Sequence, residues 1–424
     1  MKMISKRATG ALALAAVSAL VLSSCSSSGS GDEGGSAEGG STDTLKIATL
    51  LPLTGGLNFL LPPVQAGIDL ALSQIEEAGG VLGNPVEVVA ELDEGDDKDR
   101  TVIEASRDEA LASGAAFVLG AMGTGSTLHV YEDIVGAGIL MGSPSNTGVE
   151  LTGLDPFYFR VAPSDAMQAS TLAPLILNDG REKVAFLTFN NPYGIGLRDA
   201  IEDLVTAGGA EVVYGSKSEG NEFAADQTTF SAEVSAAKAS GADAIVIVTY
   251  DQVQQIVPEM LAQGINMDNV YLIDGSLVNF TDLETGAVAG INGTKPGYDA
   301  PEDFQQMLAD ANGGTPLDDL TYAAEAYDLV NITALAAEKA GDASADAIRQ
   351  QLQAVSGANG GTECTTFAEC RDLIADGEEI HYVARSGIGP LNENNDPSTA
   401  WIGVYEYTTE DNAPHFLRSE EGSI

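Results

Sequence analysis

Residues 120–129 have the sequence Gly-Ala-Met-Gly-Thr-Gly-Ser-Thr-Leu-His, and residues 141–148 have the sequence Met-Gly-Ser-Pro-Ser-Asn-Thr-Gly. The apolar residues before each loop, 116–119 and 139–141, have the length and composition of buried strands. Residues 124–136 between them fit a single helix, so the segment predicts a βαβ unit with parallel strands. Ligands in open parallel sheets bind beyond the carboxyl ends of the strands, where both loops would lie.

The first of these loops carries hydroxyl groups at the start of the expected helix. Thr124, Ser126 and Thr127, together with the free backbone N–H groups of a first helical turn, suit a carboxylate or another small anion. Hydroxyl residues before a helix are also common as plain N-caps, which need no ligand. Taken alone, the loop therefore leaves a binding site and a helix cap as alternatives.

Charge and composition exclude several classes of function. The chain has 424 residues, enough for two domains of ordinary size, and its 63 acidic against 19 basic residues give a net charge of −44. Such a field repels phosphate, which argues against nucleic acid and against an anionic membrane surface as general partners. It also disfavours a bare anion as ligand but tolerates a zwitterion or a cation. The acids are dispersed along the chain, which fits a solubilising surface.

The first 24 residues predict a lipoprotein signal peptide. Three basic residues precede an apolar run at 11–22, which is too short to span a bilayer and has the form of a secretory signal. The run ends in Leu-Ser-Ser-Cys at 22–25, which resembles the bacterial lipobox and predicts cleavage before Cys25 and lipidation of its sulfur. Residues 25–43 are rich in Ser, Gly and acids and predict a flexible tether. We therefore expect an exported protein, anchored only by lipid to the outer face of the cytoplasmic membrane.

Strand-like and helix-like segments alternate from residue 45 onward. The expected strands are 45–51, 86–92, 116–119, 139–141, 183–189, 211–214, 244–248, 270–273 and 399–407. The expected helices are 64–78, 100–112, 124–136, 166–177, 193–207, 230–239, 253–263, 302–311, 319–340 and 345–355. This alternation predicts an α/β fold with two doubly wound parallel-sheet lobes in sequence.

The chain shows neither a metal-binding pattern nor a catalytic motif. Acidic residues cluster at Asp93, Glu94, Asp96, Asp97 and Asp99, but the ligand spacing and closing Glu of a calcium-binding EF-hand are missing. A solvated loop that caps the following helix is the preferred interpretation, and we expect no metal or cofactor. The three histidines lack ligand spacing, and the motifs of hydrolases, nucleotide-binding loops and zinc proteases are missing. We therefore expect a protein that is not an enzyme.

Two cysteines remain after the lipidation site. Cys364 and Cys370 are six residues apart in a chain that we expect to be exported. An even pair in an oxidising compartment predicts a disulfide that closes a small loop.

Six motifs in a fixed order carry a resemblance to a known family. They are Leu-Pro-Leu-Thr-Gly-Gly at 51–56, the segment 64–80 ending in Ala-Gly-Gly, Ser-Pro-Ser-Asn-Thr at 143–147, Phe-Arg-Val-Ala-Pro at 159–163, Tyr-Gly-Ile-Gly-Leu at 193–197 and Tyr-Ala-Ala-Glu-Ala-Tyr-Asp at 322–328. Together they resemble the leucine/isoleucine/valine-binding protein family, the substrate-binding lipoproteins of amino-acid ABC transporters with the type I periplasmic-binding-protein fold.

The resemblance implies two lobes, joined by three crossings, that close around a ligand by a hinge. The first lobe is expected to comprise 44–162 with 298–386, and the second 163–297 with 387–411, leaving 412–424 as a tail. The crossings are expected near residues 161–163, 295–297 and 386–389.

The resemblance also places ligand-binding residues on both lobes. The family's carboxylate-binding loops match Gly123, Thr124, Ser126 and Thr127, and then Ser145, Asn146 and Thr147. On the second lobe, Tyr193 and Tyr250 match pocket aromatics, and Asp274 matches the acid that pairs with the ligand ammonium, where branched-chain members look to carry Glu. Asn58 and Phe59 are the nearest matches to a further pocket aromatic, and Phe59 is expected in the core.

Each of these residues also has an ordinary structural interpretation. Tyr193 and Tyr250 fit aromatics at helix starts, and Asp274 before Gly275 fits a turn residue.

We therefore expect a monomeric receptor that binds an amino acid of the branched-chain type, or a related small polar solute, and delivers it to ABC permease subunits. A receptor for an amide or small carboxylate is an alternative ligand class. A ligand-sensing module is a second alternative, although this sequence shows no membrane-spanning helix leading to a signalling domain. An enzyme would need a paired base and nucleophile, which are not evident.

Overall fold

The structure, a computed structural model, describes residues 44–96, 99–297, 300–317 and 319–423. The predicted signal peptide, the lipidation site Cys25 and the tether lie outside the described residues, as does Asp97 of the acidic cluster. Among the helices of the described residues, none is long and apolar enough to cross a membrane.

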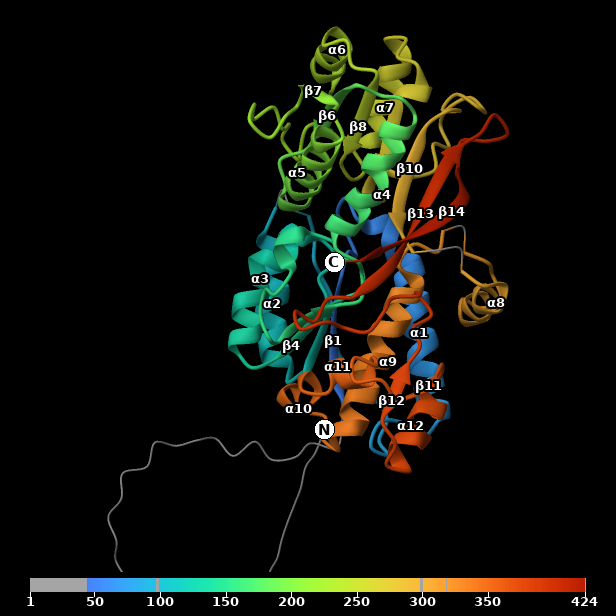
Figure 1. Ribbon diagram of the computed structural model, residues 1–424. Helices are drawn as coiled ribbons and strands as arrows, with labels where there is room; N and C mark the ends of the chain where they lie inside the picture. Colours follow the sequence, from blue (N-terminus) through green and yellow to red (C-terminus); the bar gives the residue numbers. More distant parts are fainter. Residues whose placement is uncertain (1–43, 97–98, 298–299, 318, 424) are drawn as a thin grey trace, which may run out of the picture. The chain divides into compact units, whose positions relative to one another are not determined.

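The first large sheet has five parallel strands, and it includes the two strands that precede the loops at 120–129 and 141–148 (Figure 1). Its strands, in the order β2–β1–β3–β4–β5, are β1 (Lys46–Leu51), β2 (Glu87–Asp93), β3 (Phe117–Gly120), β4 (Leu140–Ser143) and β5 (Tyr158–Arg160). Helix α3 (Thr124–Gly136) joins β3 to β4, which pair in parallel. The predicted βαβ unit is therefore confirmed.

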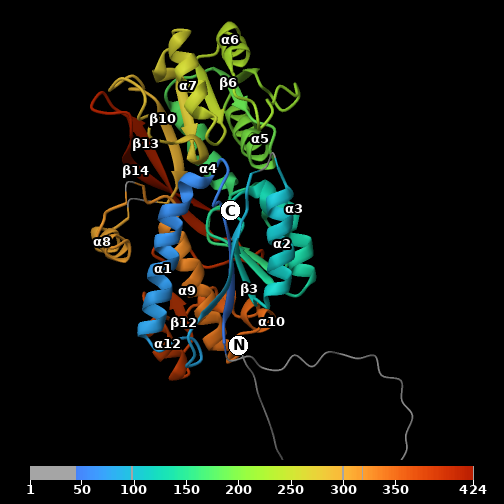
Figure 2. The same ribbon diagram turned by 180° about the vertical axis from the view of Figure 1, so that it is seen from behind.

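Helices cover both faces of this sheet. Figures 1 and 2 show α1 (Leu61–Glu77) and α9 (Ala323–Ala340) against one face, and α2 (Thr101–Ser113) and α3 against the other. Phe117 and Leu119 of β3 join the core with α1 and α9, whereas Val118 between them joins the core with α2 and α3. Alternate side chains of one strand are thus buried on opposite faces, as in a doubly wound sheet.

Two glycines permit close approaches in this half of the chain. A Cβ atom at Gly67 of α1 would lie 2.1 Å from the carbonyl oxygen of Ala323, so only glycine lets α1 pack this closely on the start of α9. Gly120 ends β3 with a φ of +127°, and a Cβ there would lie 2.0 Å from the carbonyl oxygen of Leu50.

The second sheet has seven strands in the order β14–β13–β10–β9–β8–β6–β7. They are β6 (Lys183–Thr188), β7 (Glu211–Tyr214), β8 (Ala244–Val248), β9 (Val270–Ile273), β10 (Asn292–Pro296), β13 (Thr399–Tyr407) and β14 (Pro414–Ser423). β6 to β10 are parallel, whereas β13 runs antiparallel to β10, and β14 antiparallel to β13. Helices α4 (Asp165–Asn178) and α5 (Pro192–Ala207) pack together, as do α6 (Ser231–Ala239) and α7 (Val253–Ala262). The predicted fold class is confirmed, with an antiparallel hairpin added at one edge.

The predicted tail at 412–424 is wrong for its described part. Residues 414–423 form strand β14, which pairs with β13 from Tyr407 opposite Pro414 to Thr399 opposite Ser423. The segment carries too many charged and small residues to show a strand pattern.

Other differences have local causes. The expected helix 345–355 is two helices, α10 (Ala345–Arg349) and α11 (Leu352–Val355), and α9 begins at Ala323 rather than at 319 because Tyr322 has a left-handed backbone. Strands β5 and β10 were not expected, since β5 has three residues and β10 contains Gly and Pro. Helix α8 (Glu302–Ala311) lies where it was expected.

The predicted disulfide joins a small two-stranded sheet to the helix that follows its first strand. The sheet consists of β11 (Thr362–Cys364) and β12 (Ile380–Tyr382), with α12 (Phe367–Ala375) between them. Cys364 and Cys370 form a disulfide with an S–S distance of 2.10 Å, as the sequence predicted.

The chain passes three times between elements of the two large sheets. It does so between β5 and α4, between β10 and α8, and between β12 and β13. The expected crossings near 161–163 and 386–389 fall in the first and third of these connections, and that near 295–297 falls at the end of β10.

Candidate ligand-binding site

A small cavity lies where the loop at the start of α3 faces the turn after β9. Its volume is about 20 Å³. Its polar wall comprises Thr124, Ser145, Thr147, Tyr193, Tyr250 and Asp274, six of the ten ligand-binding residues that the sequence predicts. Its remaining wall comprises Leu57, Phe59, Leu60, Met122, Gly275 and Tyr322.

The other four predicted residues are not brought to this cavity wall. The amide of Asn146 is buried and donates to the carbonyl of Ala121 at 3.1 Å and to the hydroxyl of Thr127, so both side chains fasten the loops to each other. Ser126 lines a different small cavity, and Gly123 is the N-cap of α3. Contact of these four residues with a ligand stays a prediction.

The hydroxyl side of the cavity is held by a network within the loops. Thr124 is the first residue of α3, where backbone N–H groups are free of intrahelical partners. The hydroxyl of Ser145 donates to the carbonyl of Met122 at 3.0 Å. The hydroxyl of Ser143, at the end of β4, donates to the carbonyl of Ala121 at 2.7 Å and accepts from the N–H of Asn146 at 3.1 Å. The loop is therefore fixed before any ligand arrives.

A buried arginine holds the same loop from behind. Arg160 ends β5 and is fully buried. Its guanidinium donates to the carbonyl of Gly148 at 2.8 Å and to that of Asn146 at 3.2 Å. It also donates to both carboxylate oxygens of Asp396, at 2.7 and 2.8 Å. Arg160 thus joins the loop of Ser145 and Thr147 to the connection between β12 and β13.

The opposite side of the cavity is acidic. Asp274 follows β9 directly and is 7% exposed. Its carboxylate accepts hydrogen bonds from the hydroxyls of Tyr193 at 2.6 Å and Tyr322 at 2.9 Å. Burial raises the pKa of Asp274, and these two hydrogen bonds partly offset the rise. No basic side chain of the described residues forms an ion pair with it.

A second buried acid lies beside Asp274 and was missed in the sequence. Asp165, the first residue of α4, is fully buried, and its N–H donates to the carbonyl of Thr147 at 2.7 Å. Within the described residues, no donor has hydrogen-bonding geometry to either of its carboxylate oxygens, although the Thr147 hydroxyl lies close enough to lower its pKa. Burial raises the pKa of Asp165 well above its usual value, and the nearby charge of Asp274 raises it further. Two acids near one cavity suit a ligand that brings positive charge.

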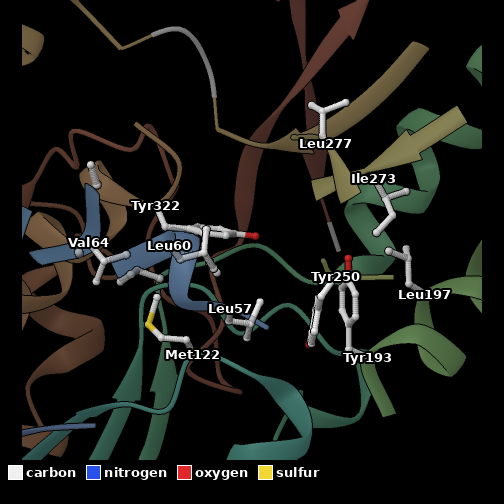
Figure 3. Packing of buried hydrophobic residues seen from close by; sticks show 14 of the residues in the cluster. Leu57, Leu60, Val64, Met122, Tyr193, Leu197, Tyr250, Ile273, Leu277 and Tyr322 are labelled. Atoms are coloured by element: carbon white, nitrogen blue, oxygen red, sulfur yellow. The ribbon is translucent and has the colours of Figure 1, made fainter. Parts of the chain in front are cut away.

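Aromatic rings form another part of the wall. Tyr193 and Tyr250 are stacked with ring centroids 5.1 Å apart, and Phe189 meets the Tyr250 ring edge-on at 4.8 Å. Figure 3 shows Tyr322 reaching from the side of Leu57 and Leu60 toward these two tyrosines.

Tyr322 and Phe59 are two aromatic residues of the cavity wall that were not among the predicted ligand-binding residues. Tyr322 has a φ of +61°, a conformation that costs a bulky residue of order 1–3 kcal/mol and is found mostly at functional sites. It opens the Tyr-Ala-Ala-Glu motif, which was the available signal. Phe59, which was expected in the core, is half-buried: it packs against the main hydrophobic core and also lines the cavity. Asn58 instead donates to the carbonyls of Pro52 and Leu53.

We next consider whether the described residues could hold a metal ion. In the part of the chain that the structure describes, no three His, Cys, Asp or Glu side chains are grouped to hold a metal ion. The arrangement offers hydroxyl and amide donors on one side and carboxylate acceptors on the other.

Comparison with known proteins identifies the family. The model of the family described as "Periplasmic binding protein" matches residues 44–376. The chain belongs to this family. The resemblance to leucine/isoleucine/valine-binding proteins is confirmed as well, since several relatives carry that name.

Relatives of this periplasmic binding protein match different shares of the chain. The Leu/Ile/Val-binding protein homolog 3 of Brucella melitensis is 31% identical over 210 residues, which cover 49% of this chain and 54% of that protein. The "chemotactic signal transduction system substrate-binding protein BasB" of Halobacterium salinarum is 26% identical over 377 residues, covering 84% of this chain and 85% of that protein.

A solved structure confirms the fold of the periplasmic binding protein. The leucine binding protein LivK of Thermotoga maritima superposes with a TM-score of 0.71 at 22% identity, covering 88% of this chain and 98% of that chain. The family consists of substrate-binding proteins, and the cavity lies at the carboxyl ends of parallel strands, where such folds bind ligands.

Proposed function

We propose that this periplasmic binding protein takes up an amino acid in the cavity between Thr124 and Asp274 and delivers it to the permease of an ABC importer. The observation that carries the proposal is the opposite polarity of the two cavity walls. Thr124 and the first turn of α3 offer donors for a carboxylate, and Asp274 offers an acceptor for an ammonium group. A zwitterion meets both requirements at once.

The charge of the protein supports a zwitterion over an anion. The net charge of −44 and the acidic side of the cavity at Asp274 disfavour a ligand that carries only negative charge. The names of the relatives point to branched-chain amino acids, whose apolar side chains suit a wall that contains Leu57, Leu60 and Met122.

Binding requires the two halves of the chain to part. A cavity of about 20 Å³ has room for about one water molecule and not for an amino acid. We infer that residues 44–162 with 298–386 form one lobe, and that 163–297 with 387–423 form the other. The lobes would open at the three connections between the sheets and close on the solute.

A thermal-shift screen against amino acids, amides and small carboxylates tests the ligand class. A solute at 100 times its dissociation constant stabilises the folded protein by about 2.7 kcal/mol, enough for a clear rise in melting temperature. We expect amino acids to give the largest shifts, and calorimetry to give one site per chain. Shifts confined to amides or simple carboxylates would overturn the amino-acid assignment.

The location of the protein follows from the signal segment. We infer an exported monomer that is lipidated at Cys25 and held at the outer face of the cytoplasmic membrane, where it meets the permease.

A sensing function is the second candidate. It is favoured by the relative named for chemotactic signal transduction, which aligns over 84% of this chain. Deletion of the gene separates the two functions. Loss of uptake of the labelled ligand supports transport, whereas normal uptake with lost chemotaxis toward the ligand supports sensing.

A further inference from the structure

A second and larger cavity adjoins the first. Its volume is about 650 Å³, within the range of about 300–1,000 Å³ that is usual for small-molecule sites. Phe59 and Tyr322 line both cavities, so these two residues lie where the cavities meet. We call the two spaces the inner cavity and the outer cavity.

Most of the wall of the outer cavity is apolar. It comes from both lobes as proposed above and includes Leu277, Phe304, Leu308, Leu320, Ala324 and Tyr405. A wall of this kind suits a hydrocarbon chain or a ring rather than a charged group.

One buried carboxylate faces this space. Glu325, in the first turn of α9, is 4% exposed and lines the outer cavity. No side chain of the described residues donates a hydrogen bond to it. Burial raises the pKa of Glu325 to about 8, so at neutral pH the group is mostly a carboxylic acid that can donate as well as accept.

Three basic residues line the same wall, and each lies beside an acidic side chain. Arg385 lies 3.6 Å from the carboxylate of Asp303, and His415 lies 2.8 Å from that of Asp411. The ammonium group of Lys295 lies 2.9 Å from the hydroxyl of Thr321, 3.4 Å from the carboxylate of Asp319 and 4.9 Å from the ring centroid of Tyr405. Glu325 and the hydroxyl of Ser386 are therefore the buried polar groups of this wall that lack a hydrogen bond from another described side chain, and Glu325 is the ionisable one of the two.

We propose that the outer cavity receives the side chain of the bound amino acid, and that this side chain is longer than that of leucine, apolar along its length and ends in a hydrogen-bonding group that reaches Glu325. The proposal rests on the proposed function, because the headgroup is placed between Thr124 and Asp274. The inner cavity holds about one water molecule and must widen even for the headgroup, whereas the outer cavity, which shares Phe59 and Tyr322 with it, already has room for a side chain.

Calorimetry with three probes of the same headgroup tests the proposal on the unaltered protein. The probes are leucine, 2-aminooctanoic acid and Nε-acetyl-lysine. We expect both long probes to bind at least tenfold more tightly than leucine, and Nε-acetyl-lysine most tightly. If leucine binds as tightly as the long probes, the proposal is overturned while the proposed function stands. If none of a full amino-acid set binds, the proposed function fails and the proposal fails with it.

Two variants locate the side chain. Ala324→Phe fills part of the outer cavity and should weaken both long probes at least tenfold while changing leucine less than twofold. Ala324→Ser is the matched control and should leave all three affinities within twofold. Glu325→Leu removes the polar group and should weaken Nε-acetyl-lysine about tenfold but not 2-aminooctanoic acid.

The leucine affinity of each variant reports whether it has folded. Unchanged affinity of the long probes in folded Ala324→Phe would place their side chains elsewhere and overturn the proposal.

Discussion

The hydroxyl of Tyr322 donates to Oδ2 of Asp274 over 2.9 Å and joins the start of α9 to the turn after β9. Tyr193 donates to the other carboxylate oxygen at 2.6 Å. Asp274 is thus oriented by two phenol groups that cannot neutralise its charge. A ligand ammonium would supply the missing positive charge, and its binding would tie the two lobes together.

Replacing Asp274 should abolish tight binding of amino acids. Because a buried ammonium without its partner costs several kcal/mol, we expect Asp274→Ala to weaken binding by on the order of 100-fold or more. Thr124→Ala removes one neutral donor and should cost roughly tenfold. Asp282→Ala, which removes a charge from an exposed loop, is the control and should leave binding unchanged. Calorimetry with the best ligand of the screen measures all three, and full affinity in Asp274→Ala would place the ammonium elsewhere.

The pH dependence of stability should reveal Glu325. Burial raises the pKa of Glu325 to about 8 in the folded protein, whereas the unfolded chain titrates near its ordinary value. Between these values the folded state holds a proton that the unfolded state lacks, so this group's stabilising effect is lost as pH rises through the window. The total is a few kcal/mol, and Glu325→Gln should remove it. Urea unfolding of both proteins at pH 5 and pH 9 measures the difference, and equal pH profiles would contradict the burial of this carboxyl.

The sequence predicts the sheets better than it predicts the cavity. The strands 117–120 and 140–143 overlap the apolar runs 116–119 and 139–141, and their loops are local features that a motif can locate. Tyr322 donates a hydrogen bond to Asp274, and the charge of Asp274 raises the pKa of Asp165. Asp274 lies far from both in the sequence, so no local pattern marks them. Strand β14 is defined by its pairing with β13 rather than by apolar residues, which explains why it was taken for a tail.

Lipidation at Cys25 is a prediction that processing experiments can decide. Cys25→Ser should stop both acylation and cleavage by the lipoprotein pathway, because the thiol is the group that is acylated. Mass spectrometry of the mature N-terminus and membrane fractionation provide the two readouts. Cleavage after residue 24 together with membrane retention in this variant would show that the anchor is not a lipid on Cys25.

Replacing Arg160 should lower the stability of the fold, because its buried partner Asp396 would lose its counter-charge. Arg160 forms a two-bond ion pair with Asp396, and both side chains are almost fully buried. Removing one member of such a pair leaves an uncompensated charge, so Arg160→Met should cost about 3–5 kcal/mol in urea unfolding. Arg160→Met with Asp396→Leu removes both charges of the pair and should recover much of this loss.

Ligand binding should respond differently to the same two variants, because Arg160 also donates to the carbonyls of Asn146 and Gly148. These bonds hold the loop that carries Ser145 and Thr147 in the cavity wall, and no apolar pair replaces them. The double variant should therefore be stable yet bind the best amino acid of the screen about tenfold more weakly than the unaltered protein. Asp396→Asn retains Arg160 and is the control for the loop, so its affinity should fall less than that of the double variant. Recovery of full affinity together with stability in the double variant would show that Arg160 serves the fold alone and does not position the loop.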